Sequence, residues 1–171
     1  MGAFAAIVVT KQLFGGLGMN FANPALVGRI ALFIGFAARM TNYTPPEGAL
    51  DGLASATPLA LAKTQSGIAM LKDLLLGTHP GMLGETCAIA LILGGIYLIA
   101  TKTISPAIPV TYLATVAVMC LLLGQDVVLH LLSGGLLLGA FFMATDYVTS
   151  PFTLKGKIVF GIGLGLITCA I

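Results

Sequence analysis

Charged side chains are scarce in this sequence of 171 residues. Lys, Arg, Asp and Glu together make up 8% of it, tryptophan is absent, and the formal net charge is only +2. No run of basic residues occurs, and no basic patch is interleaved with aromatic residues, as a nucleic-acid-binding surface would require. The composition therefore excludes nucleic acid as a partner.

Cysteine and histidine are also too few and too scattered to suggest a metal centre. Cys87, Cys120 and Cys169 lie far apart within apolar runs, and no Cys-x-x-Cys pair is present. We expect the three cysteines to be small buried apolar residues. His130 has no second ligand three or four positions away, so we expect a hydrogen-bonded helix residue. The sequence predicts no metal site.

Apolar residues dominate what remains. They form 58% of the chain, and the mean hydropathy is +1.06, far above the range of soluble domains. The long apolar blocks have the length of helices and lack the alternation of a barrel strand. We expect an all-α integral membrane protein, a polytopic helical bundle forming a single transmembrane domain over residues 1–171. The blocks cover residues 24–38, 83–100, 106–123 and 127–145.

Both ends of the chain carry apolar segments that are too short to span a bilayer, over residues 1–10 and 158–171. We therefore expect the chain to be the interior of a longer protein. Glycines recur in the apolar blocks, notably the pairs at 94–95 and 134–135 with Gly139, and the spaced residues Gly161, Gly163 and Gly165. Small residues allow helices to approach closely in lipid, so these glycines predict packed helix faces.

The basic residues of the short connections predict the orientation. Alternating helices place Lys11, Lys102, Lys155 and Lys157 on one side, which the positive-inside rule assigns to the cytoplasm. Residues 41–82 then form an extracytoplasmic loop. Its two lysines oppose this assignment, but long loops count less in that rule. We expect a multi-pass protein of the cytoplasmic (inner) membrane.

The stretch DGLASATPLA, residues 51–60, lies in that loop. Thr57 is suited to cap a short helix that begins at Pro58, because a hydroxyl accepts from free N–H groups and proline needs no donor at the first position. The N-terminus of a helix is also a site for anions. Spacing alone thus allows a plain cap or a phosphate at Thr57.

The same stretch resembles the flavin-attachment site of the D subunit of the Rnf complex, and of the related B subunit of the sodium-translocating NADH:quinone reductase. In those families an acid precedes a run of small residues that ends at a threonine; Asp51 and Thr57 are the matching residues here. Three more stretches agree in order: FGGLGMNFANPALVGR at 14–29, GET at 84–86 and MATDYVTSP at 143–151. The SATPL ending is closer to D subunits, although Ala54-Ser55 stands where Ser-Gly is commoner.

The resemblance implies an electron-relay subunit of an ion-translocating ferredoxin:NAD oxidoreductase, with FMN bound to Thr57 through a phosphoester. Asp51, Ser55, Ala56 and Pro58 would flank the attachment point. It further implies a flavin transferase acting outside the cytoplasm and neighbouring membrane subunits, with ferredoxin and NAD bound by other subunits. A second, non-covalent flavin is a further candidate cofactor. No residue of this chain need act as acid, base or nucleophile, since the flavin supplies the chemistry.

Three polar residues in or next to the first long apolar block are further candidates. Asn20 and Asn23 follow a glycine-rich turn, which predicts a transporter-like broken helix that lines an ion path or a flavin pocket, or that only packs. Arg29 lies within the block and must face a carboxylate, backbone carbonyls or a flavin phosphate. Glu85 is expected to begin and cap a helix, and Asp146 to end one.

Two other classes of function remain open at this stage. A channel or permease without flavin is one, because the NPA at 23–25 occurs in aquaporins, although only one copy is present. A purely structural membrane anchor is the other. Within the redox class, the B-type subunit of a sodium-translocating NADH:quinone reductase is the alternative. Flavin fluorescence that stays with the denatured chain would separate the redox class from the others.

Overall fold

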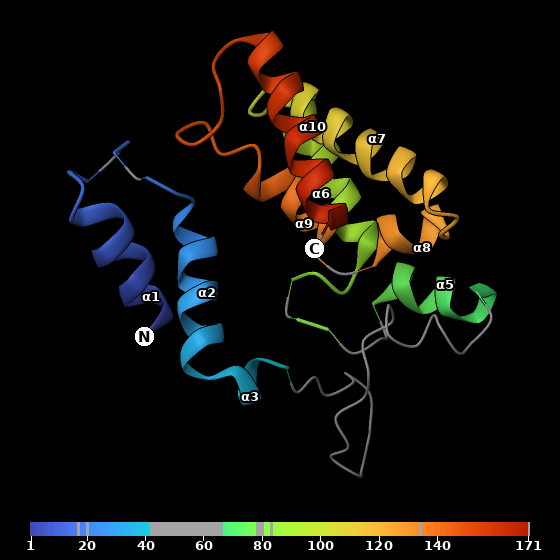
Figure 1. The fold of residues 1–171 in the computed structure, drawn as a ribbon, viewed down its shortest axis with the longest axis horizontal. Coiled ribbons are helices and arrows are strands. Elements are labelled where there is room, and N and C mark those ends of the chain that lie inside the picture. The colour runs from blue at the N-terminus through green and yellow to red at the C-terminus, as the bar shows by residue number, and fades with distance from the viewer. Residues whose placement is uncertain are drawn as a thin grey trace.

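The computed structural model describes residues 1–16, 18, 19, 21–41, 67–77, 81, 82, 84–133 and 135–170. These residues form helices and turns, and none of them lies in a strand, so the all-α prediction is confirmed for them. Figure 1 shows an N-terminal helical pair beside a larger group of helices. No helix within the described ranges has both the length and the apolar character required to cross a membrane.

The N-terminal pair consists of two helical segments that pack closely. The first is α1 (Gly2–Phe4), which continues as the π-helix η1 (Ala5–Gln12); the second is α2 (Pro24–Gly35). A Cβ on Gly28 would lie 2.9 Å from the carbonyl oxygen of Gly2, so glycine is needed where the backbones meet. The short N-terminal apolar segment is therefore helical and packs on the first long block.

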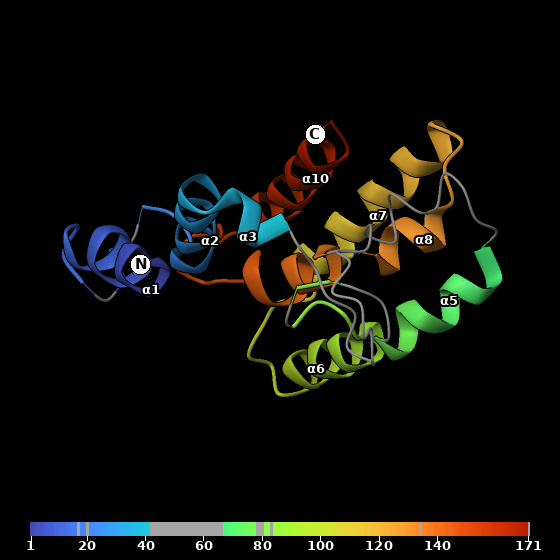
Figure 2. The ribbon, with the colours of Figure 1, turned by 90° about the horizontal axis from the view of Figure 1, so that it is seen from below.

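The larger group contains α6 (Ala88–Ala100), α7 (Ala107–Leu122), α8 (Val127–Leu132), α9 (Leu136–Leu138), the π-helix η2 (Gly139–Met143) and α10 (Leu154–Ala170). One core cluster joins α7 to η2 through Tyr112, Val116, Cys120 and Ala140. A second joins α6 to α9 and contains Ala88, Leu91 and Leu137. The two clusters place η2 and α9 in the middle of the group, as Figure 2 also shows.

Glycines mark helix contacts at several of the predicted positions. Gly95 lies against the ring of Phe141 and Gly94 against that of Phe142, while Gly161 and Gly165 lie against α7. Gly139 and Gly163 have no atom within 4 Å of an added Cβ, so the expectation of packing is wrong at these two positions. Of the three cysteines, Cys120 is buried and the other two are half-buried.

Two of the predicted continuous blocks are interrupted. The block at 127–145 divides into α8 and α9, with Ser133 in extended backbone at the break, and then continues as η2. The block at 24–38 is broken at Phe36 between α2 and α3 (Ala37–Thr41). Apolar periodicity cannot reveal such breaks, because residues on both sides of a break are equally apolar.

The predicted loop at 41–82 contains a further helix, α5 (Gly67–Leu76). It packs against α6 and α8, and its Leu74 is fully buried. Gly77, with φ of +83°, follows the helix in the left-handed conformation that glycine adopts readily. The short helix predicted at Pro58 lies outside the described residues.

Candidate functional site

Asn23 both begins α2 and ties it to the larger group of helices. Its side-chain oxygen accepts hydrogen bonds from the N–H groups of Ala25 at 3.0 Å and Leu26 at 3.4 Å. Its amide nitrogen donates to the carbonyl of Met143 at the end of η2, at 3.2 Å. Pro24 occupies the first helical position, where its missing N–H costs nothing. Asn23 therefore provides hydrogen-bond acceptors for the free N–H groups at the start of α2 and holds that helix end against η2.

The turn before Asn23 depends on glycine. Gly15, Gly16 and Gly18 have φ values of +116°, +91° and +83°, which other L-residues rarely adopt. This turn reverses the chain between η1 and α2. The sequence prediction of a glycine turn followed by a helix start at Asn23-Pro24 is confirmed.

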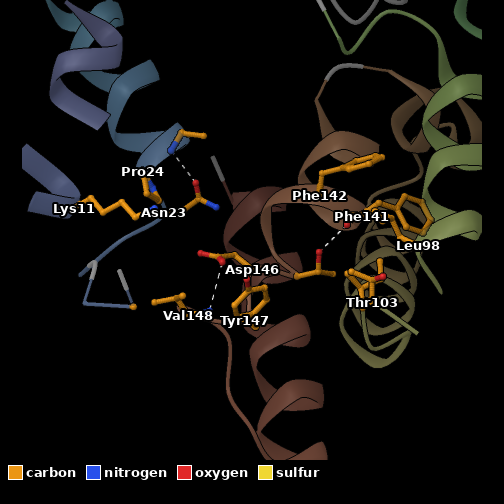
Figure 3. A pocket seen from close by; sticks show the side chains of 14 residues that line it. Lys11, Asn23, Pro24, Leu98, Thr103, Phe141, Phe142, Asp146, Tyr147 and Val148 are labelled. Atoms are coloured by element: carbon orange, nitrogen blue, oxygen red, sulfur yellow. Dashed lines mark hydrogen bonds between the residues drawn. The ribbon is translucent and has the colours of Figure 1, made fainter. Parts of the chain in front are cut away.

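A cavity of about 800 Å³ lies between the N-terminal pair and the larger group (Figure 3). Lys11 and Asn23 line it from the first, and Phe141, Phe142 and Asp146 from the second. Its volume is within the range of small-molecule sites. Aromatic rings and a lysine can together hold a planar ring that carries polar or anionic groups. The remaining lining residues are Gly18, Pro24, Ala25, Leu98, Thr103, Ile104, Thr145, Tyr147 and Val148.

Asp146 organises the turn that follows η2. Its carboxylate accepts hydrogen bonds from the N–H of Val148 at 3.4 Å and from the hydroxyl of Thr149 at 3.2 Å. Its carbonyl accepts from the N–H of Ser150 at 2.9 Å. The prediction that Asp146 ends a helix is wrong by three residues, because η2 ends at Met143 and Asp146 belongs to the turn that follows. Part of its hydrogen-bonding capacity is thus used within its own turn.

Arg29 has a carboxylate partner, one of the alternatives that the sequence left open. Its Nη1 lies 3.6 Å from Oε2 of Glu85, with the arginine side chain 39% exposed and the glutamate side chain 11% exposed. The other oxygen of Glu85 accepts from the N–H of Met82 at 3.4 Å. Oε2 itself is buried and has no hydrogen-bond donor among the described residues. The ion pair joins α2 to the turn before α6.

The expectation that Glu85 begins and caps a helix is wrong. Helix α6 begins at Ala88, its N-cap residue is Cys87, and no side chain caps it. The carboxylate of Glu85 instead lies beside the break between α8 and α9. A Cβ on Gly135 would be 2.8 Å from Oε2 and 3.8 Å from Nη1 of Arg29. Gly135 thus leaves room for the pair, which is a role that the predicted helix packing did not include.

His130 has the local structural role expected of it. Its Nδ1 lies 3.0 Å from the carbonyl oxygen of Asp126, one turn earlier. Within the described part of the chain no group of three or more His, Cys, Asp or Glu side chains could hold a metal ion.

Six of the predicted cofactor-binding residues lie outside the residues that the structure describes. They are Asn20 and, in the flavin-attachment stretch, Asp51, Ser55, Ala56, Thr57 and Pro58.

Sequence reasoning missed two features of this region. One is the break between α8 and α9, for which the sequence triplet Ser-Gly-Gly was a usable signal, since it combines a hydroxyl residue with two helix-weakening glycines. The other is α5, for which Leu71, Leu74 and Leu75 have helical spacing and Gly77 stands one position past the end. The cavity has no sequence signal, because its walls come from segments more than a hundred residues apart.

Comparison with known proteins gives a consistent result. The chain is 48% identical over its whole length to the D subunit of the Na⁺-translocating ferredoxin:NAD⁺ oxidoreductase complex of Acetobacterium woodii, and covers 55% of that protein. It is 41% identical to the D subunit of the proton-translocating complex of Clostridium ljungdahlii and 39% identical to that of the ion-translocating oxidoreductase complex of Rhodobacter capsulatus. It covers 57% and 58% of those two proteins, so it spans little more than half the length of these relatives. Because the NQR2, RnfD, RnfE family matches residues 1–171 as well, the chain belongs to that family.

Proposed function

We propose that this chain is part of a D-type subunit of an ion-translocating ferredoxin:NAD oxidoreductase and relays electrons through a bound flavin. The observation that carries the proposal is similarity over the whole chain to three D subunits, at 48%, 41% and 39% identity. The motif stretches at 14–29, 51–60, 84–86 and 143–151 support the same assignment. The B-type subunit is less favoured, because the SATPL stretch resembles D subunits more closely.

The proposal places the chain in the cytoplasmic membrane. Its mean hydropathy of +1.06 supports this, and so does the surface of its helices. Large apolar side chains such as Phe33, Ile34, Leu121, Leu122 and Val159 are exposed on α2, α7 and α10. Apolar surface on successive turns of several helices is costly in water and is the surface that lipid solvates.

The site of attachment that we propose for FMN is Thr57. An acid, Asp51, stands six residues before it, and the small residues Ser55 and Ala56 and the following Pro58 complete the motif. A phosphoester to the threonine hydroxyl would fix the phosphate end of the flavin in the loop at 41–82. The flavin would supply one- and two-electron chemistry, and the chain would supply its position. A flavin transferase outside the cytoplasm is the partner that this attachment requires.

The cavity between the N-terminal pair and the larger group is our candidate for a second, non-covalent flavin. Phe141, Phe142 and Tyr147 offer aromatic surface to a planar ring, while the ammonium group of Lys11 suits polar or anionic substituents. Asn23 contributes by fixing the start of α2 beside the cavity. Ferredoxin and NAD would bind other subunits, and neighbouring membrane subunits would carry electrons across the bilayer to an extracytoplasmic flavin.

The test uses the full-length protein purified from cells that contain the transferase. After denaturation and electrophoresis, flavin fluorescence should stay with the wild-type chain and be lost with Thr57→Ala, and intact mass should fall by one FMN besides the side-chain change. Thr57→Ser keeps a hydroxyl and is expected to retain part of the flavin. Thr64→Ala, in the same loop, is the matched control and should retain all of it.

Covalent flavin that persists in Thr57→Ala would contradict the attachment site. A wild-type chain without any flavin would contradict the electron-relay function and favour a permease or an anchor. The sidedness of the loop is tested separately by Ser66→Cys, whose thiol should react with a membrane-impermeant reagent in intact cells. Reaction only in inside-out vesicles would reverse the predicted topology.

A further inference from the structure

Helices α7 and α10 begin at the same end of the larger group. Gly161 of α10 lies against Thr111 of α7. One turn later along both helices, Gly165 lies against Thr115, so the two helices run in the same direction. Their starts and the connection from α6 to α7 therefore lie at one end of the group, which is its top in Figure 1. Three lysines belong to these segments: Lys102, Lys155 and Lys157.

This end of the group carries positive charge without a described acidic partner. None of the three lysines belongs to an ion pair within the described part of the chain, and two of them are exposed. Of the described acidic side chains, Glu85 precedes α6 and Asp126 follows α7, at the opposite ends of those helices. Asp146 lines the cavity, and its carboxylate accepts two hydrogen bonds within its own turn. The lysines are therefore available to a negatively charged partner.

Lys102 occupies a backbone position at which glycine is the usual residue. It follows α6 with φ of +57°, and it is the one residue other than glycine with positive φ in the described ranges. The N–H of Lys102 donates to the carbonyl of Ile99, and that of Thr103 donates to the carbonyl of Leu98, both at 3.0 Å. This pair of bonds ends a helix through a left-handed residue, a conformation that glycine adopts without strain. A lysine held there despite the strain indicates a use for its ammonium group.

Two large apolar side chains are exposed next to the lysines of α10. Phe152 is 90% exposed and Leu154 is 65% exposed. Their segment is held in place, because the hydroxyl of Thr153 accepts a hydrogen bond from the N–H of Gly156 at 3.2 Å. A Cβ on Gly156 would also lie 2.9 Å from the side chain of Pro151, so the turn is closely packed. The exposure of the two apolar side chains is therefore a feature of a fixed turn.

We propose that Lys102, Phe152, Leu154, Lys155 and Lys157 form a surface, the lysine surface, that binds an anionic phospholipid. The ammonium groups would pair with the phosphate of the headgroup, while the two apolar side chains would lie among the first carbons of the acyl chains. The inference rests on the membrane placement in the proposed function.

A lipid suits the lysine surface better than an acidic protein for two reasons. Cationic and large apolar side chains alternate within a few residues, which matches a ligand whose charged and apolar parts are adjacent. The lysines also lie at the end of the helices that the positive-inside rule assigns to the cytoplasm, and the cytoplasmic leaflet carries the anionic lipids.

The test measures lipid binding by the purified full-length protein in detergent. The midpoint of thermal unfolding is followed while phosphatidylglycerol is added to the micelles. Phosphatidylcholine with the same acyl chains is the comparison lipid, and inorganic phosphate is the third titrant. A ligand that binds the folded state raises this midpoint with its concentration. The wild type should show a saturable rise with phosphatidylglycerol that neither phosphatidylcholine nor inorganic phosphate reproduces, and high salt should weaken it.

Lys102→Gly separates the charge from the fold. Glycine relieves the left-handed strain, so without lipid this variant should be at least as stable as the wild type. It should bind phosphatidylglycerol about fivefold more weakly, the effect of one lysine near an anionic surface. Lys155→Gln should weaken binding by a similar factor, and Phe152→Ser should weaken it without a change of charge. Lys72→Gln removes an exposed lysine from α5, which contacts the segment before α6 at the opposite end; this matched control should leave the titration unchanged.

Two results would overturn the inference directly. One is a wild type that responds equally to phosphatidylglycerol and phosphatidylcholine, and the other is an unchanged lipid response in Lys102→Gly. Amine labelling of the complete complex adds a third. If Lys102 and Lys155 stay shielded from the reagent after lipid has been removed, a neighbouring subunit covers the surface and the lipid site is refuted.

The flavin content of the same preparations separates this inference from the proposed function. A chain that carries covalent flavin but shows no preference for phosphatidylglycerol would refute the lipid site and leave the electron-relay function standing. A flavin-free chain with a preference that Lys102→Gly weakens would refute the electron relay and support the lipid site.

Discussion

Helix α10 offers a direct test of the packing, because three of its glycines have very different surroundings. A Cβ on Gly165 would lie 2.6 Å from the Cβ of Thr115 and 3.2 Å from the carbonyl oxygen of Tyr112. Thr115 cannot turn away freely, since its hydroxyl donates to the carbonyl of Thr111 at 2.7 Å. Gly163, one half-turn earlier, has no atom within 4 Å of an added Cβ. Gly165→Ala should force α7 and α10 apart, and Gly163→Ala should not.

The difference between the two variants isolates the contact. Both gain the same helix propensity, about 0.8–1.0 kcal/mol for alanine over glycine. Only Gly165→Ala incurs the cost of overpacking, typically about 1–3 kcal/mol. We therefore expect Gly165→Ala to be less stable than Gly163→Ala by about 1–3 kcal/mol, with Gly163→Ala equal to or slightly more stable than wild type.

The assay is reversible unfolding of the full-length protein in mixed micelles, followed by far-UV circular dichroism. Gly161→Ala is a second packed variant, because its added Cβ would lie 3.2 Å from the carbonyl oxygen of Ile108 and would overlap Thr111. The free energy of unfolding of Gly161→Ala should be lowered about as much as that of Gly165→Ala. Equal stability of Gly163→Ala and Gly165→Ala would refute the argument that α10 packs on α7 through these glycines.

Three further predictions concern the candidate site and the core. Asn23→Ala loses the helix cap and the bond to η2 and should destabilise the protein by about 1–3 kcal/mol, whereas Asn23→Asp keeps the cap and should lose less; chemical denaturation measures both. Gly135→Ala should lower the free energy of unfolding more than Gly139→Ala does, because only the first added methyl group crowds the carboxylate of Glu85. The difference between the two variants should become smaller when both also carry Glu85→Ala, which a double-mutant cycle measures. Tyr112→Phe removes a 2.8 Å hydrogen bond to α10 and should lower the unfolding free energy by about 0.5–1.5 kcal/mol.

The sequence predicted those parts of the fold that depend on local chemistry. The start of α2 follows from a glycine turn, an asparagine cap and a proline, all of which act on backbone close to them in the chain. The need of Arg29 for a partner follows from its apolar surroundings. Which carboxylate pairs with it could not be predicted, because Glu85 is distant in sequence and belongs to a turn, not to a helix start.

Long-range arrangement was the part that sequence patterns could not supply. At the break between α8 and α9, Gly135 makes room for a carboxylate from elsewhere in the chain, and hydropathy has no signal for that requirement. The cavity depends on where Asn23 is anchored against Met143, a contact between residues 120 positions apart. The attachment stretch was recognised from its motif alone, and Thr57 lies outside the described residues.

The two π-helical segments have a consequence for how this chain can change in length. Bonds from Leu13 to Val8 and from Ala144 to Gly139 span five residues where an α-helix spans four, so η1 and η2 each accommodate surplus backbone. A one-residue deletion in η2 would remove this surplus and restore ordinary helical pairing, with the two flanking parts of the helix kept near their present orientation. Phe141 and Phe142 belong to η2 itself, so the deletion would change the wall of the cavity there while the helix survived. A deletion at this place should thus be tolerated by folding and alter the cavity, whereas a deletion in the regular helix α7 would rotate its two parts by about 100° relative to each other.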